Sequence, residues 1–209
     1  MENGQFKHAG WKTRQIVAAA FGLATLLIVR TTAQAKDGAN WLDRPLVGWN
    51  KPGAALPQAP VVTERRETLE KRCQLTSRRS TGAERAVDAA GWIAFLNYDQ
   101  PLVREDMEIV GGMSAADGMC RPEGYNLFVF VGGRFAGVLS PAVMTSRLDG
   151  SSGAVRMLSP DRLSAEFARY KEGDALCCPS SRVSVRYRID RASGRPVVEP
   201  IEIRTTRGG

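Results

Sequence analysis

The four cysteines of this 209-residue chain, Cys73, Cys120, Cys177 and Cys178, are the residues with the clearest chemistry. An even number of cysteines favours disulfide bonds if the chain is exported, as its N-terminus indicates below. A four-thiolate metal site is a weaker interpretation, because no pair of C-x-x-C motifs is present. Three connectivities are possible. Our first expectation joins Cys73 to Cys120 and Cys177 to Cys178, and the two crossed patterns remain open.

The adjacent pair Cys177 and Cys178 has a second interpretation. A bond between neighbours closes a small ring, and exposed bonds of unusual geometry are often labile or redox-active. We favour structural disulfides because the chain has no thioredoxin-type C-x-x-C motif. A thiol–disulfide function at this pair is retained as an alternative.

The single histidine, His8, lies in an N-terminal segment that we expect to be removed. A mature chain without imidazole cannot use Ser-His-Asp or Cys-His catalysis, and it lacks the commonest zinc ligand. We therefore predict no catalytic residues, no metal site and no cofactor.

Residues 97–124 are rich in carboxylates and are expected to form a loop. Paired carboxylates can hydrolyse glycosidic bonds, but these do not follow the order of a calcium-binding loop. We interpret them as solvated charge, and a carboxylate-based periplasmic hydrolase is the enzymatic alternative. The six residues are Asp99, Glu105, Asp106, Glu108, Asp117 and Glu123.

Arg182, Arg186 and Arg188 alternate with apolar residues and should share one face of a strand. Such a row of guanidinium groups can bind a phosphate or a sugar acid. Glu199 and Glu202 lie on the following strand and could neutralise it by cross-strand pairing. The three arginines are thus a possible anion-binding site, weighed against an ordinary solvated face.

The elements that must position these residues form three consecutive parts. Residues 1–35 read as a signal peptide, residues 36–80 as an extended proline-rich arm, and residues 81–209 as an α+β domain. A mixed-charge stretch at the end of the arm is typical of a short solvated helix with a Glu67–Lys71 pair. Trp41 and Trp49 should fasten the arm to the domain, and a contact with a partner is the alternative.

The domain is predicted to contain one packed helix and about six strands in an antiparallel meander. A capping box, Thr81 to Glu84, begins a helix that we place over residues 82–96. The predicted hairpins pair residues 125–131 with 134–139, 154–158 with 163–170, and 182–190 with 197–204. The first of these strands is apolar on both faces, so it should be central and covered on both sides.

The N-terminal segment has basic residues, a 14-residue apolar stretch from 16 to 29, and an A-x-A site ending at Ala35. The stretch is shorter than the roughly 20 residues of a membrane-spanning helix. We therefore expect cleavage near Ala35 and a periplasmic or secreted protein with no stable membrane span, and an uncleaved anchor is the alternative. Residues 1–35 hold four of the 29 basic and one of the 22 acidic residues, so cleavage lowers the net charge from +7 to +4. That charge is too small to indicate nucleic acid as a partner.

Residues 91–188 resemble the LppP/LprE-type envelope proteins, a group of exported bacterial proteins that includes lipoproteins. The likeness is carried by YNLFVFVGGRFAGVL at 125–139, by the strand after Arg162, and by DALCCPS at 174–180. It implies an exported, β-rich domain of unassigned activity, with no catalytic residues to carry over. No cysteine lies near the cleavage site, so we expect a non-lipidated member.

Together these observations favour a non-catalytic envelope module that binds an envelope protein or an anionic envelope polymer. They exclude no enzyme class outright apart from those that depend on histidine.

Overall fold

The computed structural model describes residues 40–95 and 102–207. The chain divides into two units, residues 1–37 and 38–209, and everything below concerns the second. Its elements in chain order are a 3-10 helix η1 (Trp41–Asp43), α1 (Arg66–Cys73), α2 (Gly82–Ala89), β1 (Ile93–Phe95), β2 (Leu102–Arg104), β3 (Met107–Ala116), β4 (Pro122–Val131), β5 (Arg134–Val138), β6 (Ser152–Ser159), β7 (Arg162–Arg169), β8 (Ser181–Asp190) and β9 (Val197–Arg207).

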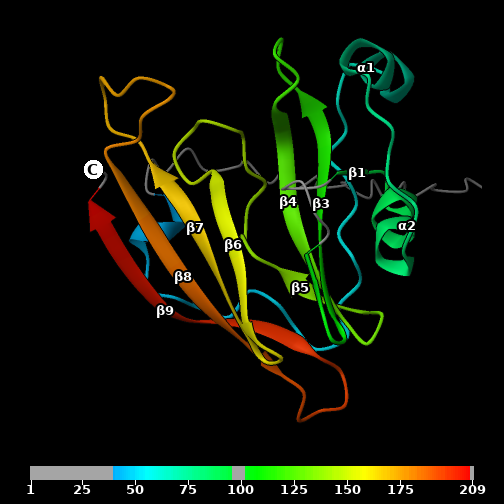
Figure 1. Ribbon diagram of the computed structural model, residues 1–209, viewed down its shortest axis with the longest axis vertical. Helices are drawn as coiled ribbons and strands as arrows, with labels where there is room; N and C mark the ends of the chain where they lie inside the picture. The colour runs from blue at the N-terminus through cyan, green and yellow to red at the C-terminus, as the bar shows by residue number, and fades with distance from the viewer. Residues whose placement is uncertain (1–39, 96–101, 208–209) are drawn as a thin grey trace, which may run out of the picture. The chain divides into compact units, whose positions relative to one another are not determined.

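The strands form two antiparallel sheets. The first sheet has the order β1-β3-β4-β5, with β2 also paired to β3, and the second has the order β6-β7-β8-β9. Figure 1 shows α2 beside β3, on the side away from β6–β9. The α+β class is therefore confirmed, and the second sheet is a meander in sequence order. The described part of the chain contains more strands and helices than the predicted set of about six strands and one packed helix.

Of the additional strands in the described residues, β1 lies within the predicted helix, and β2 and β3 lie in residues 97–124, where a loop was expected. That prediction was wrong, because β2 and β3 occupy much of this segment. The β3 strand is hard to recognise because its centre is made of small residues. A Cβ atom on Gly112 would lie 2.8 Å from Phe128 and 2.9 Å from Val87 of α2. The glycine is therefore required for the close approach of α2 to the sheet.

The predicted helix over residues 82–96 is shorter than expected. Its capping box is present, with Thr81 Oγ1 accepting from the Glu84 amide, but the helix ends at Ala89. Gly91 follows with a φ of +87°, a left-handed conformation that ends helices. Ile93, which lies within the predicted helix, belongs instead to β1 and pairs with Met113 of β3.

The hairpin predictions are confirmed by the pairing of β4 with β5, β6 with β7, and β8 with β9. The strand β4 lies between β3 and β5 and is covered on both faces, as expected. Leu127 faces the core between the two sheets, whereas Phe128 faces the core under α2. Both side chains are fully buried.

The segment before α1 contacts both sheets. The Trp41 ring packs edge-on against Phe167 of β7, with centroids 5.0 Å apart. Trp49 donates from Nε1 to the Val138 carbonyl of β5 over 2.9 Å. The α1 helix is the short helix expected here, although its i,i+4 ion pair joins Arg66 to Glu70 rather than Glu67 to Lys71.

Asp88 connects the two helices. Its carboxylate accepts from Arg66 of α1, from Arg79 Nε over 2.6 Å and from Ser77 Oγ over 2.7 Å. Ser77 in turn accepts from the Ala94 amide of β1. Burial alone would raise the pKa of Asp88, but the hydrogen bonds from Arg79, Ser77 and Arg66 outweigh it and lower the pKa to about 2.

We predict that Asp88→Asn destabilises the protein at neutral pH and not at pH 2. A carboxyl whose pKa is lower in the folded than in the unfolded chain stabilises the fold above its unfolded pKa, here 3.8. This contribution, about 2 kcal/mol at pH 7, is lost as the pH falls from about 4 to 2. Urea unfolding of both proteins across this range measures it. A stability difference that stays constant down to pH 2 would contradict the assignment.

Candidate functional site

The predicted arginine row lies on the outer face of β8. Arg182, Arg186 and Arg188 are exposed and alternate with the buried Val183, Val185, Tyr187 and Ile189. The structure therefore places the three side chains together on one face, as the sequence pattern indicates.

Two of these arginines have acidic partners on β9. Arg186 lies 3.3 Å from Glu202, and Arg188 lies 2.7 Å from Glu199. The Glu199 carboxylate raises the pKa of Arg188. Arg182 has no ion pair among the described residues. The cross-strand pairs weighed above are thus present, and they neutralise part of the row.

The register of the second sheet adds basic residues that the sequence analysis missed. Arg156 of β6 lies opposite Ser164, which lies opposite Arg186, so Arg156 shares the outer face. Arg162 lies opposite Arg188. We call this surface the arginine face. Its charged residues are Arg156, Arg162, Arg182, Arg186, Arg188 and Arg204, with Glu166, Asp190, Glu199 and Glu202. Only the strand pairing reveals this set.

A cavity of about 370 Å³ lies at one end of the arginine face, and Arg182 belongs to both. We call it the inter-sheet pocket, because β4 supplies Pro122 and Tyr125 while the second sheet supplies Ala168 and Arg182. Sequence reasoning did not find it, because its walls come from segments between residues 121 and 182 that share no motif. Its lining residues are Arg121, Pro122, Tyr125, Ser146, Arg147, Ser151, Ser152, Gly153, Ala168, Tyr170, Leu176, Cys177, Pro179 and Arg182.

The segment from 144 to 152 forms one wall and joins the two sheets. Its Met144 and Tyr125 of β4 exchange backbone hydrogen bonds, and its Ser151 carbonyl accepts from the Ala168 amide of β7. The Tyr125 hydroxyl also accepts from the Ser152 amide over 2.9 Å. Burial raises the pKa of Tyr125, although its hydrogen bonds with Ser152 act in the opposite direction.

Asp149 fixes the same wall from outside. Its carboxylate accepts from Asn40 Nδ2, from Arg169 Nε and from the Tyr170 amide, over 2.7, 2.9 and 3.0 Å. Arg169 also forms a two-point contact with Asp43 of η1. The pocket wall is therefore held by charge-assisted hydrogen bonds rather than left as a free loop.

The DALCCPS segment forms another part of the pocket. Asp174 closes this loop by accepting from the Lys171 amide and from the amide and hydroxyl of Ser180. The hydrogen bond from the Ser180 hydroxyl is the main cause that lowers the pKa of Asp174, and the two amides add to it. The Tyr170 hydroxyl donates to the Leu176 carbonyl. These hydrogen bonds, all within the loop and its flanking residues, explain the conformation of the motif.

The structure joins Cys177 to Cys178 within this loop, and both are exposed. Cys177 lines the inter-sheet pocket, whereas Cys178 does not. The adjacent pair is therefore part of a pocket wall, a position that the sequence did not indicate.

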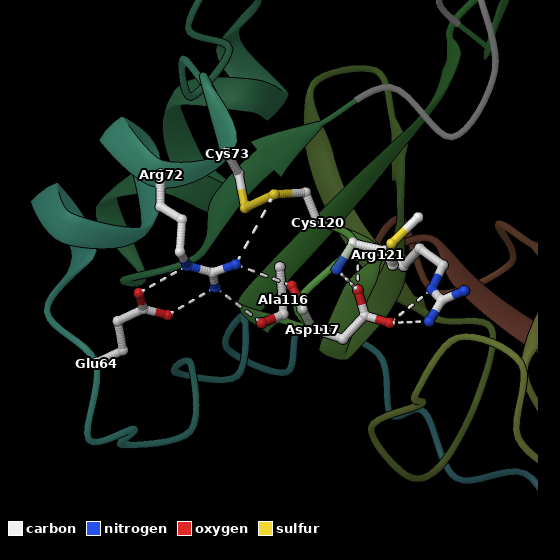
Figure 2. The surroundings of a disulfide bond; sticks show 8 residues. Glu64, Arg72, Cys73, Ala116, Asp117, Cys120 and Arg121 are labelled. Atoms are coloured by element: carbon white, nitrogen blue, oxygen red, sulfur yellow. Dashed lines mark hydrogen bonds and ion pairs between the residues drawn. A yellow bond between two sulfur atoms is a disulfide. The ribbon is translucent and has the colours of Figure 1, made fainter.

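The Cys73–Cys120 disulfide is present as expected and leaves no free cysteine. It joins the end of α1 to the turn between β3 and β4 (Figure 2). Arg72 supports the same junction, since it binds Glu64 on one side and donates to the Asp117 and Ala116 carbonyls on the other. Cys120 has a φ of +61° in a turn held by Asp117.

Three of the six predicted carboxylates have separate partners, whereas Glu105 and Glu123 have no ion pair among the described residues. Asp106 pairs with Arg191, Glu108 accepts from Thr81 Oγ1, and Asp117 pairs with Arg121. Asp99 lies outside the described residues. Within residues 40–95 and 102–207, no group of three or more His, Cys, Asp or Glu side chains could hold a metal ion. In the same part of the chain, the helices are too short or too polar to cross a membrane.

Comparison with known proteins gives a match to a protein family. No curated protein and no solved structure matches the chain significantly. Residues 103–192 match the family model described as LppP/LprE lipoprotein. This region runs from β2 to the end of β8 and includes the DALCCPS loop and all lining residues of the inter-sheet pocket. The match supports membership of the chain in the LppP/LprE lipoprotein family.

Proposed function

We propose that this protein is a non-catalytic envelope module that binds an anionic polymer through the arginine face. The observation that carries the proposal is the excess of six arginines over four acidic residues on an exposed sheet surface. Arg186 and Arg204 share Glu202, Arg188 pairs with Glu199, and Arg162 lies 3.6 Å from Asp161. Arg156 of β6 and Arg182 of β8 have no ion pair among the described residues, and the shared glutamate leaves the face with net positive charge. Polyanions bind such extended surfaces through many weak contacts that salt screens.

The family match is the support for an envelope location. The proposal includes cleavage near Ala35 and a periplasmic or secreted protein that is not lipidated. Support for an enzyme is weaker, because Asp106, Glu108 and Asp117, three of the five described carboxylates that could pair for hydrolysis, are bound to separate cations or hydroxyls. The exposure of Cys177 and Cys178 keeps thiol–disulfide chemistry as the alternative function.

Replacing Arg182, Arg186 and Arg188 by glutamine should weaken binding to an anionic polysaccharide about tenfold or more, since charge-assisted contacts carry it. The measurement is the binding of the unchanged protein and of the variant to immobilised polygalacturonate at low salt. Binding of the unchanged protein should be lost as the salt concentration rises. The melting temperature should change little, because exposed ion pairs contribute about 0–1 kcal/mol each.

The matched control replaces Arg44, Arg65 and Lys71 by glutamine. All three are exposed, none has an ion pair among the described residues, and none lies on the arginine face. The control removes the same charge, so it should retain most of the binding. Equal losses in the two variants would show that only net charge matters, and the proposed face would be wrong.

A further inference from the structure

We infer that the inter-sheet pocket is a second binding site, specific for a single anionic sugar unit such as a sugar acid or a sugar phosphate. This inference goes beyond the proposed polymer surface, with which it shares only Arg182. The cavity of about 370 Å³ lies within the range of about 300–1,000 Å³ typical of small-molecule sites.

The charge of the pocket indicates an anion. Arg121, Arg147 and Arg182 line it, and no aspartate or glutamate is among the lining residues. Arg121 is paired with Asp117 from outside the pocket. Arg147 and Arg182 have no ion pair in the described part of the chain. Two unpaired guanidinium groups beside one cavity are suited to a carboxylate or a phosphate.

A buried hydroxyl in the same pocket gives independent evidence for a ligand. The Ser151 residue is only 5% exposed, and it lines the cavity. Its backbone is hydrogen-bonded, but its hydroxyl has no hydrogen-bond partner among the described residues. Buried polar groups are nearly always satisfied by protein, water or ligand. A ligand hydroxyl in the pocket would supply the missing partner.

The remaining walls favour a sugar over a bare inorganic anion. Ser146 and Ser152 add further hydroxyl groups, while Tyr170 and Leu176 add apolar surface. A sugar unit presents hydroxyls together with apolar C–H faces, and a carboxylate or phosphate on it would reach the arginines. Inorganic phosphate would use the arginines alone and leave the other contacts empty.

The test is calorimetric titration of the disulfide-bonded protein with four probes. The probes are a hexuronic acid, a hexose phosphate, the neutral hexose and inorganic phosphate. We expect one or both anionic sugars to bind about tenfold more tightly than inorganic phosphate and the neutral hexose, because hydrogen bonds to charged groups and to buried hydroxyls combine. Equal binding of inorganic phosphate, or no binding of either anionic sugar, would overturn the inference.

Two variants locate the site. Arg147→Gln should weaken binding of the anionic sugar about tenfold through loss of a charge-assisted hydrogen bond. Ser151→Ala should weaken it several-fold and leave the melting temperature unchanged, since no protein group loses a partner. Arg186→Gln, outside the pocket, is the control and should bind the sugar normally. Unchanged binding in both pocket variants would contradict the site.

These results are independent of the polymer surface. Arg147 and Ser151 do not belong to the arginine face, so loss of sugar binding in these variants with retained polymer binding supports the pocket alone. Loss of polymer binding in the triple-arginine variant, with no binding of any small probe to the unchanged protein, would support the face and overturn the pocket.

Discussion

Replacing both Cys73 and Cys120 by serine is expected to lower the free energy of unfolding by about 4 kcal/mol on the chain-entropy model. The bond links residues 47 apart in the sequence, so without it the unfolded chain gains the freedom of a large loop. Urea unfolding under non-reducing conditions measures the change. The double variant Cys177→Ser and Cys178→Ser is the control, because that bond spans neighbours and closes no long loop.

Proteolysis should also locate the effect. Without the disulfide, α1 is held by the side-chain hydrogen bonds of Arg72 and Asp88. The earlier part of the arm keeps its own hydrogen bonds, from Trp49 and to the Pro57 carbonyl, which do not depend on the disulfide. New cleavage should therefore concentrate around α1, and the sheets should persist. Cleavage at the same sites in the Cys177/Cys178 control, or equal stability of the two double variants, would show that the arm does not depend on this bond.

Substitution of Asn50 is expected to have the second large effect on the free energy of unfolding. Its Nδ2 donates to the Val138 carbonyl of β5 and to the Val198 carbonyl of β9, and its Oδ1 accepts from the Val138 amide. This one side chain therefore joins both sheets. Asn50→Ala removes three hydrogen bonds and should cost about 3 kcal/mol in the free energy of unfolding.

Gly137→Ala tests the same contact from β5. Gly137 has a φ of +138°, and a Cβ there would lie 2.3–2.7 Å from the Asn50 amide group. We expect a loss of about 3 kcal/mol or more, from backbone strain plus displacement of Asn50. Gly133→Ala is the control, since its φ is also positive but no atom lies within 4 Å of the added Cβ. Chemical unfolding compares them, and equal losses would mean that Asn50 contributes nothing.

The sequence predicts the hairpins well because their signals are local. The strands β4 and β8 have β-branched, aromatic or alternating residues, and Gly132 with Gly133 or Ser193 with Gly194 mark the turns. The capping box of α2 is equally local. The β3 strand within residues 97–124 was missed because Gly111 and Gly112 conceal its alternation. Gly111 is required for the close approach of Phe95 in β1, and Gly112 for that of Val87 in α2, and both neighbours lie elsewhere in the chain.

The candidate site likewise has one part that the local sequence predicts and another part that it does not. The arginine row of β8 follows from simple alternation, but Arg156 and Arg162 join it only through strand register. The inter-sheet pocket has no local signal, since Arg147 and Ser151 become neighbours of Arg182 only when a connecting segment is hydrogen-bonded to both sheets. Sequence patterns identify a face of one strand; they do not identify a cavity between sheets.

The attachment of the arm to β5 has a consequence for association between molecules. The strand β5 ends the first sheet, and an edge strand with open backbone groups is a template for pairing with another chain. Here Trp49 and Asn50 occupy both the carbonyl and the amide of Val138. The arm therefore blocks addition of a further strand at this point, and a chain beginning after it would expose a surface suited to aggregation.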